Sequence, residues 1–233
     1  MPAGNADRQS LVDDLLADPP VIHPMGVTAS GTSMGVWSTD EACYRFIADR
    51  CGPGTRTLET GCGLSTVLFA ALGCQHVCCT AGQDEADRVL ADCERRGIAT
   101  AALSFRVGSS HQTLPVMEAA GTELDLVLVD GSHGFPLPML DWFYAGSMLR
   151  QGGALLVDDL DLPAVGALNA FVKRDPRWQS ITLTAKWGAW EKRRAGTLSE
   201  DWTEQAFYTT TRRRLKRYSQ RVIAKIRRTL RRR

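Results

Sequence analysis

The sequence predicts an α/β protein in which a doubly wound, mostly parallel sheet lies between two layers of helices. Short β-type runs alternate with helical ones from residue 55 to residue 172 and form five strand–helix units. Successive units of this kind build a parallel sheet that is covered on both faces. The 233 residues are 44% hydrophobic and 23% charged, which is typical of a folded domain and excludes a fully disordered chain.

The ordered core is expected to begin at residue 38. Residues 38–41 are Ser-Thr-Asp-Glu, a capping-box pattern that starts a helix, and the Gly-Pro-Gly at 52–54 ends that helix. Residues 1–37 contain one short amphipathic stretch at 11–16 and a loop rich in Gly, Ser and Thr at 26–35. We expect this N-terminal part to form a lid or access segment.

The domain that follows is expected to span 38–210. Its strands are apolar or alternating runs, and its helices carry apolar residues three to four positions apart. The strands are expected at 56–60, 76–80, 101–107, 124–130 and 154–157, and the helices between and after them at 65–72, 84–96, 112–120, 138–149 and 163–172. The stretches 178–190 and 202–210 alternate between apolar and polar residues, which predicts a terminal antiparallel hairpin.

The cysteines indicate a reducing environment. There are seven, an odd number, and no two of them have the spacing of zinc or redox motifs. We expect buried thiols, with His76 and Cys78 on one face of a strand and Cys79 on the other. No apolar run approaches the roughly 18 residues of a membrane span, and the first residues lack the pattern of a signal peptide. These features predict a cytoplasmic protein.

A glycine turn follows the first strand of the domain. Gly61-Cys62-Gly63 leads directly from that strand into a helix, and such a turn lets the backbone approach a ligand closely. Ser65 or Thr66 stands where a dinucleotide-binding loop would have another glycine, and the Lys of a P-loop is absent. The turn therefore matches neither of those two motifs.

The turn and two later segments resemble the motifs of class I S-adenosyl-L-methionine-dependent methyltransferases. In the first motif of that family an acidic residue precedes the Gly-x-Gly turn, and here Glu59, Gly61 and Gly63 match it. The segments 124–133 and 152–159 are similar to the fourth-strand and fifth-strand motifs. The resemblance covers about 39–210. It implies a Rossmann-like fold with a mostly parallel seven-stranded sheet that ends in an antiparallel hairpin.

The resemblance also implies a set of residues that bind S-adenosyl-L-methionine. Members of the family usually have an acid at the end of the second strand that binds the ribose hydroxyls, and this chain lacks it there. Gln83 is the predicted substitute, while Asp84 and Glu85 are interpreted as first-turn residues that suit the dipole of the next helix. The predicted cofactor-binding residues are Glu59, Gly61, Cys62, Gly63, Gln83, Gly108 and Ser109.

Three carboxylates are expected to converge at the carboxyl ends of two neighbouring strands. Asp130 ends one strand, and Asp158 and Asp159 end the strand expected beside it. Carboxylates placed so close repel one another unless a cation or protons neutralise them, and oxygen ligands favour Mg²⁺ or another hard divalent cation. This set resembles the metal site of the cation-dependent O-methyltransferases, both the catechol type and the sugar-hydroxyl type. The alternative is that Asp130 caps a turn and the Asp pair is merely solvated.

His133 follows Asp130 by three residues, the offset at which catechol-type enzymes carry their catalytic Lys. His133 or Asp130 is predicted to accept the proton of an acceptor hydroxyl; a loop histidine bonded to the backbone is the alternative. The resemblance therefore implies O-methylation of a small-molecule or sugar hydroxyl. Two rivals stay open: an RNA methyltransferase that uses a basic tail, and an inactive protein that only binds S-adenosylmethionine.

The basic tail is the segment 211–233. It contains twelve of the 28 Lys and Arg residues and no acid, which leaves 16 basic and 26 acidic residues before it. Apolar residues recur in it at spacings of three and four, at Leu215, Tyr218, Val222, Ile226 and Leu230. This pattern predicts an amphipathic helix that holds the protein at an anionic membrane surface, with each basic residue contributing about 1 kcal/mol.

Vesicle flotation tests the prediction for the tail. The full chain should float with anionic liposomes, and a truncated chain that ends at Thr210 should not, because it lacks both the charges and the apolar stripe. Equal partitioning of the two chains would contradict membrane binding. Salt-sensitive retention of RNA by the full chain alone would instead favour the RNA alternative.

Overall fold

A seven-stranded sheet forms the centre of the protein, in a computed structural model that describes residues 5–28, 31–208 and 218–220. The sheet order is β5-β4-β3-β6-β7-β9-β8, in which the pairs β7–β9 and β9–β8 are antiparallel and the other four pairs are parallel. The strands are β3 (Arg56–Thr60), β4 (Gln75–Thr80), β5 (Leu103–Val107), β6 (Leu124–Val129), β7 (Leu149–Val157), β8 (Trp178–Leu183) and β9 (Gly188–Lys192). The predicted fold class is confirmed.

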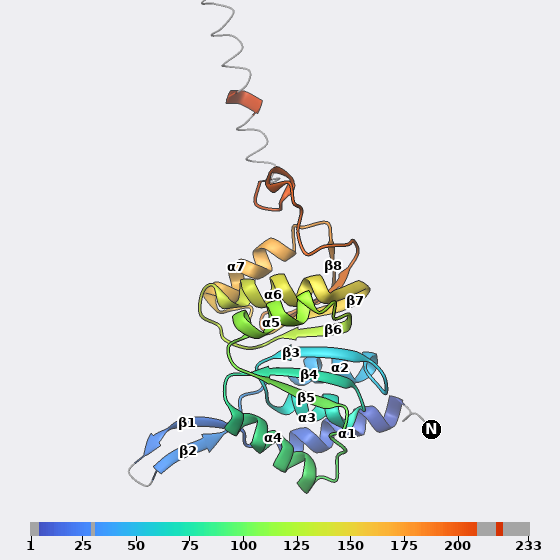
Figure 1. The fold of residues 1–233 in the computed structure, drawn as a ribbon, viewed down its shortest axis with the longest axis vertical. Coiled ribbons are helices and arrows are strands. Elements are labelled where there is room, and N and C mark those ends of the chain that lie inside the picture. The colour runs from blue at the N-terminus through green and yellow to red at the C-terminus, as the bar shows by residue number, and fades with distance from the viewer. Residues whose placement is uncertain (1–4, 29–30, 209–217, 221–233) are drawn as a thin grey trace, which may run out of the picture.

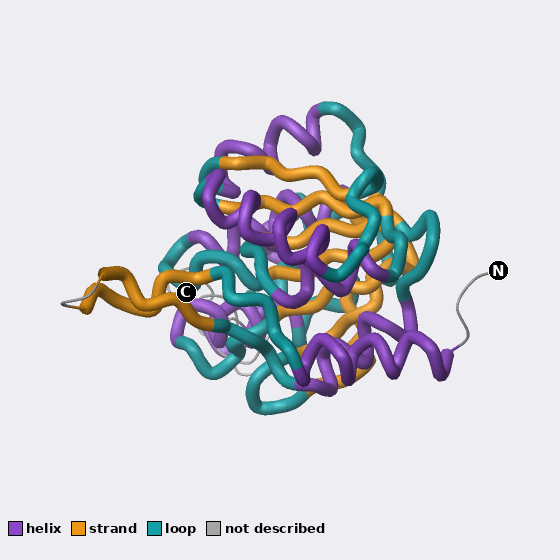
Figure 2. Tube along the Cα trace, turned by 90° about the horizontal axis from the view of Figure 1, so that it is seen from below, coloured by secondary structure: helices purple, strands orange, loops and turns teal. Residues whose placement is uncertain are grey.

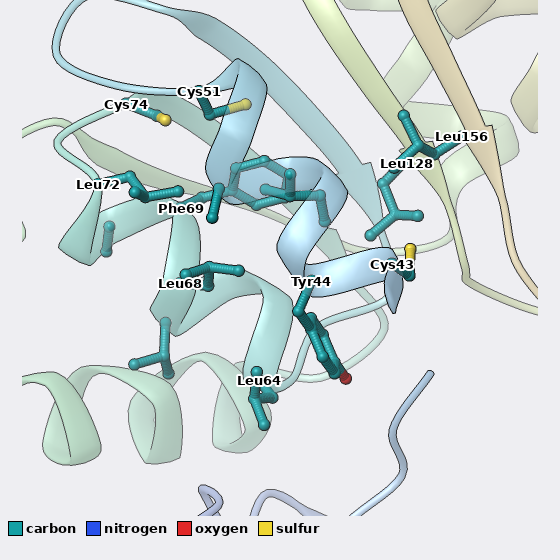
Figure 3. Close-up of a cluster of buried hydrophobic side chains, with 14 of the residues drawn as sticks. Cys43, Tyr44, Cys51, Leu64, Leu68, Phe69, Leu72, Cys74, Leu128 and Leu156 are labelled. Carbon is teal, nitrogen blue, oxygen red and sulfur yellow. The ribbon is translucent and has the colours of Figure 1, made fainter. Parts of the chain in front are cut away.

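Two layers of helices cover the two faces of this sheet (Figure 1). The first layer packs on Cys78, Leu128 and Leu156 and consists of α1 (Asn5–Ala17), α2 (Glu41–Arg50), α3 (Leu64–Ala71) and α4 (Gln83–Arg95). Figure 3 shows part of this cluster. The second layer packs on the opposite face and consists of α5 (Ser110–Ala119), α6 (Leu137–Met148) and α7 (Pro163–Val172). Cys79 belongs to the second cluster, so the predicted alternation of Cys78 and Cys79 is confirmed.

The terminal hairpin differs from the prediction in its position. Both of its strands, β8 and β9, come from the stretch 178–192, whereas 202–204 is a short 3-10 helix. A turn at 184–187 divides what the sequence presents as one alternating run. The Thr184 hydroxyl stabilises that turn, because it accepts hydrogen bonds from the backbone N–H groups of Lys186 (3.2 Å) and Trp187 (2.9 Å).

The N-terminal part also contains more regular structure than predicted. The expected loop at 26–35 is largely a two-stranded ribbon, β1 (His23–Thr28) and β2 (Gly31–Gly35), which projects from the body of the protein (Figure 2). Helix α1 is longer than the predicted stretch, and its Val12 and Leu15 are buried in the first core cluster. Asp40 precedes α2 as its N-cap residue but makes no side-chain capping bond, so the capping box is not formed.

The tail falls almost wholly outside the described residues. Only 218–220 of the segment 211–233 are described, and they are helical. The amphipathic helix that the sequence predicts there stays a prediction. Among the described helices, none is long and apolar enough to cross a membrane.

Candidate active site

A cavity of about 810 Å³ opens at the carboxyl ends of the parallel strands, the edge at which open α/β sheets bind ligands. Backbone hydrogen bonds align the ends of β3, β6 and β7 there. Asp130 N–H donates to the Thr60 carbonyl (3.2 Å), and Asp158 N–H donates to the Val129 carbonyl (3.1 Å). The glycine turn and the segments 108–110, 130–133 and 158–159 line one continuous space.

The two glycines of the turn serve different purposes. Gly61 has a φ of 86°, and a Cβ atom there would overlap the carbonyl oxygen of Asp130, so only glycine allows the turn to cross the end of β6 so closely. A Cβ at Gly63 would meet only ordinary contacts, 3.6 Å from His23 Nε2 and 3.8 Å from the Trp37 carbonyl. The space beside Gly63 therefore belongs to the cavity.

Glu59 lies beneath the turn and does not line the cavity. Its buried carboxylate accepts hydrogen bonds from the hydroxyls of Ser65 (2.6 Å) and Thr66, and His76 Nε2 lies 3.1 Å from it. The sequence predicts Glu59 as a cofactor-binding residue, but the structure gives it a supporting position. It fixes the start of α3 and thereby the glycine turn.

Gln83 is also outside the cavity, and Glu85 is inside it. The Gln83 side chain is exposed and donates to Asp87 (2.8 Å), so the structure does not bring the predicted ribose substitute to the site. Glu85 accepts a hydrogen bond from the Thr80 hydroxyl (2.6 Å) and lies 3.3 Å from His23 Nδ1. The sequence places Glu85 correctly in the first turn of α4 but does not indicate that Glu85 lines the cavity.

The remaining predicted cofactor-binding residues line the cavity as expected. Cys62 lies beside Thr80, with 3.4 Å between Sγ and the hydroxyl oxygen, and Gly108 and Ser109 are also among the lining residues. Two residues from outside the predicted motifs complete the lining: His23 and Trp37, whose rings stack at 4.7 Å. Both come from the N-terminal part, where the sequence gives no motif to identify them.

The acidic end of the cavity contains all three predicted carboxylates, but in a different grouping. Ligand atoms of Asp130, His133 and Asp159 all lie within 4.8 Å of one another. Asp158 also lines the cavity, and its Oδ1 is buried without a hydrogen-bond partner among the described residues. Lys186, which the sequence analysis did not single out, lies 3.5 Å from Asp159 Oδ1.

The environment of these acids opposes their ionisation. Burial raises the pKa of Asp130 well above its usual value, and the negative charges of Asp158, Asp159 and Glu59 raise it further. Burial also raises the pKa of Asp158, and Asp159 adds to that effect. A bound cation would relieve the repulsion, and the orphaned Asp158 oxygen together with the carboxylates of Asp130 and Asp159 fits a divalent ion.

Comparison with known proteins gives a family match over part of the chain. Residues 58–160 match the model of a protein family called Methyltransferase domain. No curated protein matches the chain by sequence.

Solved structures share the fold. A protein from Corynebacterium glutamicum has a TM-score of 0.57 at 14% identity, covering 80% of this chain and 90% of its own. A protein from Staphylococcus aureus, provisionally named a caffeoyl-CoA O-methyltransferase, has a TM-score of 0.56 at 11% identity (67% and 86% covered). Rv0187 from MTB, solved with its cofactor bound, has a TM-score of 0.53 at 19% identity (81% and 89% covered).

At these identities the structural likeness shows the fold alone. The family match within that fold supports the class of S-adenosylmethionine-dependent methyltransferases, and the resemblance stated from the sequence is confirmed.

The raised pKa of Asp130 predicts a pH-dependent effect of its removal. Between the unfolded pKa and the higher folded pKa, the folded protein keeps a proton that the unfolded chain has released, so stability falls as pH rises through this window. Asp130→Asn should therefore melt at a higher temperature than the wild type at pH 7, and the difference should shrink towards pH 4.

Asp125→Asn provides the control with the opposite sign. A hydrogen bond from Arg56 lowers the pKa of Asp125, so this variant should melt below the wild type at pH 7. An Asp130→Asn protein that is less stable than the wild type at pH 7 would contradict the account of the acidic end.

Proposed function

We propose that the protein transfers the methyl group of S-adenosylmethionine to a hydroxyl oxygen of a small molecule or sugar. One observation carries the proposal: a single cavity joins the glycine turn to a cluster of one histidine and three carboxylates. The glycine turn suits a cofactor that the protein backbone approaches closely. The cluster of one histidine and three carboxylates suits a methyl acceptor that must lose a proton.

The chain's own residues would hold the cofactor from two sides. The backbone of the turn at Gly61–Gly63 and the N-terminus of α3 line the cavity, and Glu85 provides a carboxylate there that can accept hydrogen bonds from the ribose hydroxyls. We assign ribose binding to Glu85 in place of Gln83. When bound, S-adenosylmethionine supplies an electrophilic methyl group on its sulfonium.

His133 is the proposed proton acceptor. Its Nε2 lies 3.1 Å from Asp159 Oδ2, and a neutral imidazole that donates from Nε2 keeps the lone pair of Nδ1 for an acceptor hydroxyl. Asp159 orients the ring in this arrangement. Asp130, Asp158 and Asp159 are the residues proposed to hold a divalent cation, which would lower the pKa of the acceptor hydroxyl.

Cofactor binding tests the first half of the proposal. Gly63→Val should weaken binding of S-adenosylmethionine at least tenfold, because the branched side chain fills the space beside the turn, where a Cβ atom meets only ordinary contacts to His23 and Trp37. Isothermal titration calorimetry measures the affinity, and thermal melting checks the fold. Unchanged affinity in a folded variant would move the cofactor site elsewhere.

Dependence on metal tests the second half. Methyl transfer from labelled S-adenosylmethionine to a panel of catechols, other phenols and sugars should stop in excess chelator and return with added Mg²⁺. Asp158→Asn combined with Asp159→Asn should lose turnover but keep cofactor affinity. Full turnover in chelator would remove the cation from the proposal and leave His133 as the proton acceptor.

A further inference from the structure

Lys186 is held firmly at the acidic end of the cavity, although it belongs to the β8–β9 turn, outside the matched residues 58–160. Its ammonium donates to the Ser38 carbonyl (3.1 Å) and lies 3.5 Å from Asp159 Oδ1. Its carbonyl accepts a hydrogen bond from the backbone N–H of Leu160 (2.6 Å). The turn is thus bonded to the residue that follows Asp159, which fixes the two side chains opposite each other.

Asp159 is fully engaged by basic groups of the chain itself. Lys186 contacts one carboxylate oxygen and His133 Nε2 contacts the other at 3.1 Å. Asp159 also has a φ of 54°, the only positive φ of a non-glycine residue in the described part of the chain. Such a conformation persists only where the surroundings enforce it, and here it goes with a carboxylate that lies between two basic side chains.

The carboxylates that line the cavity explain why the ammonium of Lys186 lies among them. Among the described residues that line the cavity, Lys186 is the single Lys or Arg, and it shares the space with Asp130, Asp158 and Asp159. Desolvation lowers the pKa of Lys186, but the charges of Asp158 and Asp159 outweigh it and raise the pKa above its usual value. The ammonium therefore stays charged and offsets part of the repulsion among the acids.

We propose that Lys186 occupies the cation site from within the chain and competes with a divalent cation for Asp159. This inference rests on the cation site of the proposed function. An ammonium and a divalent ion cannot share one carboxylate oxygen without strong repulsion, so a bound ion displaces Lys186 from Asp159, and Lys186 keeps its bond to the Ser38 carbonyl. Lys186 thereby weakens cation binding and makes it specific for ions that ligate strongly enough to replace it.

Binding of Mn²⁺ to the full chain tests the competition without any acceptor. The concentration of free Mn²⁺ is measured by electron paramagnetic resonance for the wild type, Lys186→Met, Lys186→Arg and Lys173→Met. Lys186→Met should bind Mn²⁺ at least tenfold more tightly, which corresponds to about 1.4 kcal/mol. Lys186→Arg keeps the charge, and Lys173 is exposed at the end of α7, so both should bind as the wild type does.

Two results would overturn the proposal. One is an affinity in Lys186→Met that equals or falls below that of the wild type, including no binding by either protein. The other is tight binding that survives when Asp159→Asn is added to Lys186→Met, because the ion would then lie elsewhere. Calorimetry with S-adenosylmethionine on the same proteins separates these failures from a failure of the cofactor site, since Lys186→Met leaves the glycine turn unchanged.

Discussion

The buried carboxylate of Glu59 holds together the elements from which the cavity is built. Glu59 lies on β3, accepts hydrogen bonds from Ser65 and Thr66 at the start of α3, and contacts His76 on β4. A buried carboxylate is costly unless its oxygens are bonded, and these three partners provide the bonds. The ring of His76 is fixed in turn by Phe69, with 4.4 Å between ring centroids. The glycine turn keeps its shape because both of its ends are tied to this one group.

The turn then brings the two halves of the proposed reaction into one space. Gly61 lies against the backbone of Asp130 at the end of β6. The glycine turn and the carboxylates therefore lie next to each other in the cavity. Segments from outside the matched domain complete the walls. His23 stacks on Trp37 and contacts Glu85, and Lys186 contacts Asp159 among the carboxylates. The N-terminal part and the β8–β9 turn therefore both contribute to the lining of the cavity.

The sequence predicts the parts of this arrangement that depend on local pattern. The strands, the glycine turn and the acids at strand ends follow from short motifs, and Gly61, Gly63, Ser109 and Asp130 lie in the cavity as expected. The differences concern the partners of side chains and contacts between distant segments. Glu59 and Gln83 lie at the expected places in the chain, but their side chains bond to other residues and do not line the cavity. His23 and Lys186 could not be found, because only the folded chain brings the N-terminal ribbon and the β8–β9 turn to the cavity. The turn that carries Lys186 is also hidden inside an alternating stretch.

We propose above all that this cavity binds S-adenosylmethionine between the glycine turn and Glu85. A crystal structure of the full chain with S-adenosylhomocysteine tests this directly. We expect density for the amino-acid end of the ligand along Gly61–Gly63, with the ribose hydroxyls bonded to Glu85 and the base beside Ser109. A ligand bound outside this cavity, or one whose ribose does not contact Glu85, would contradict it.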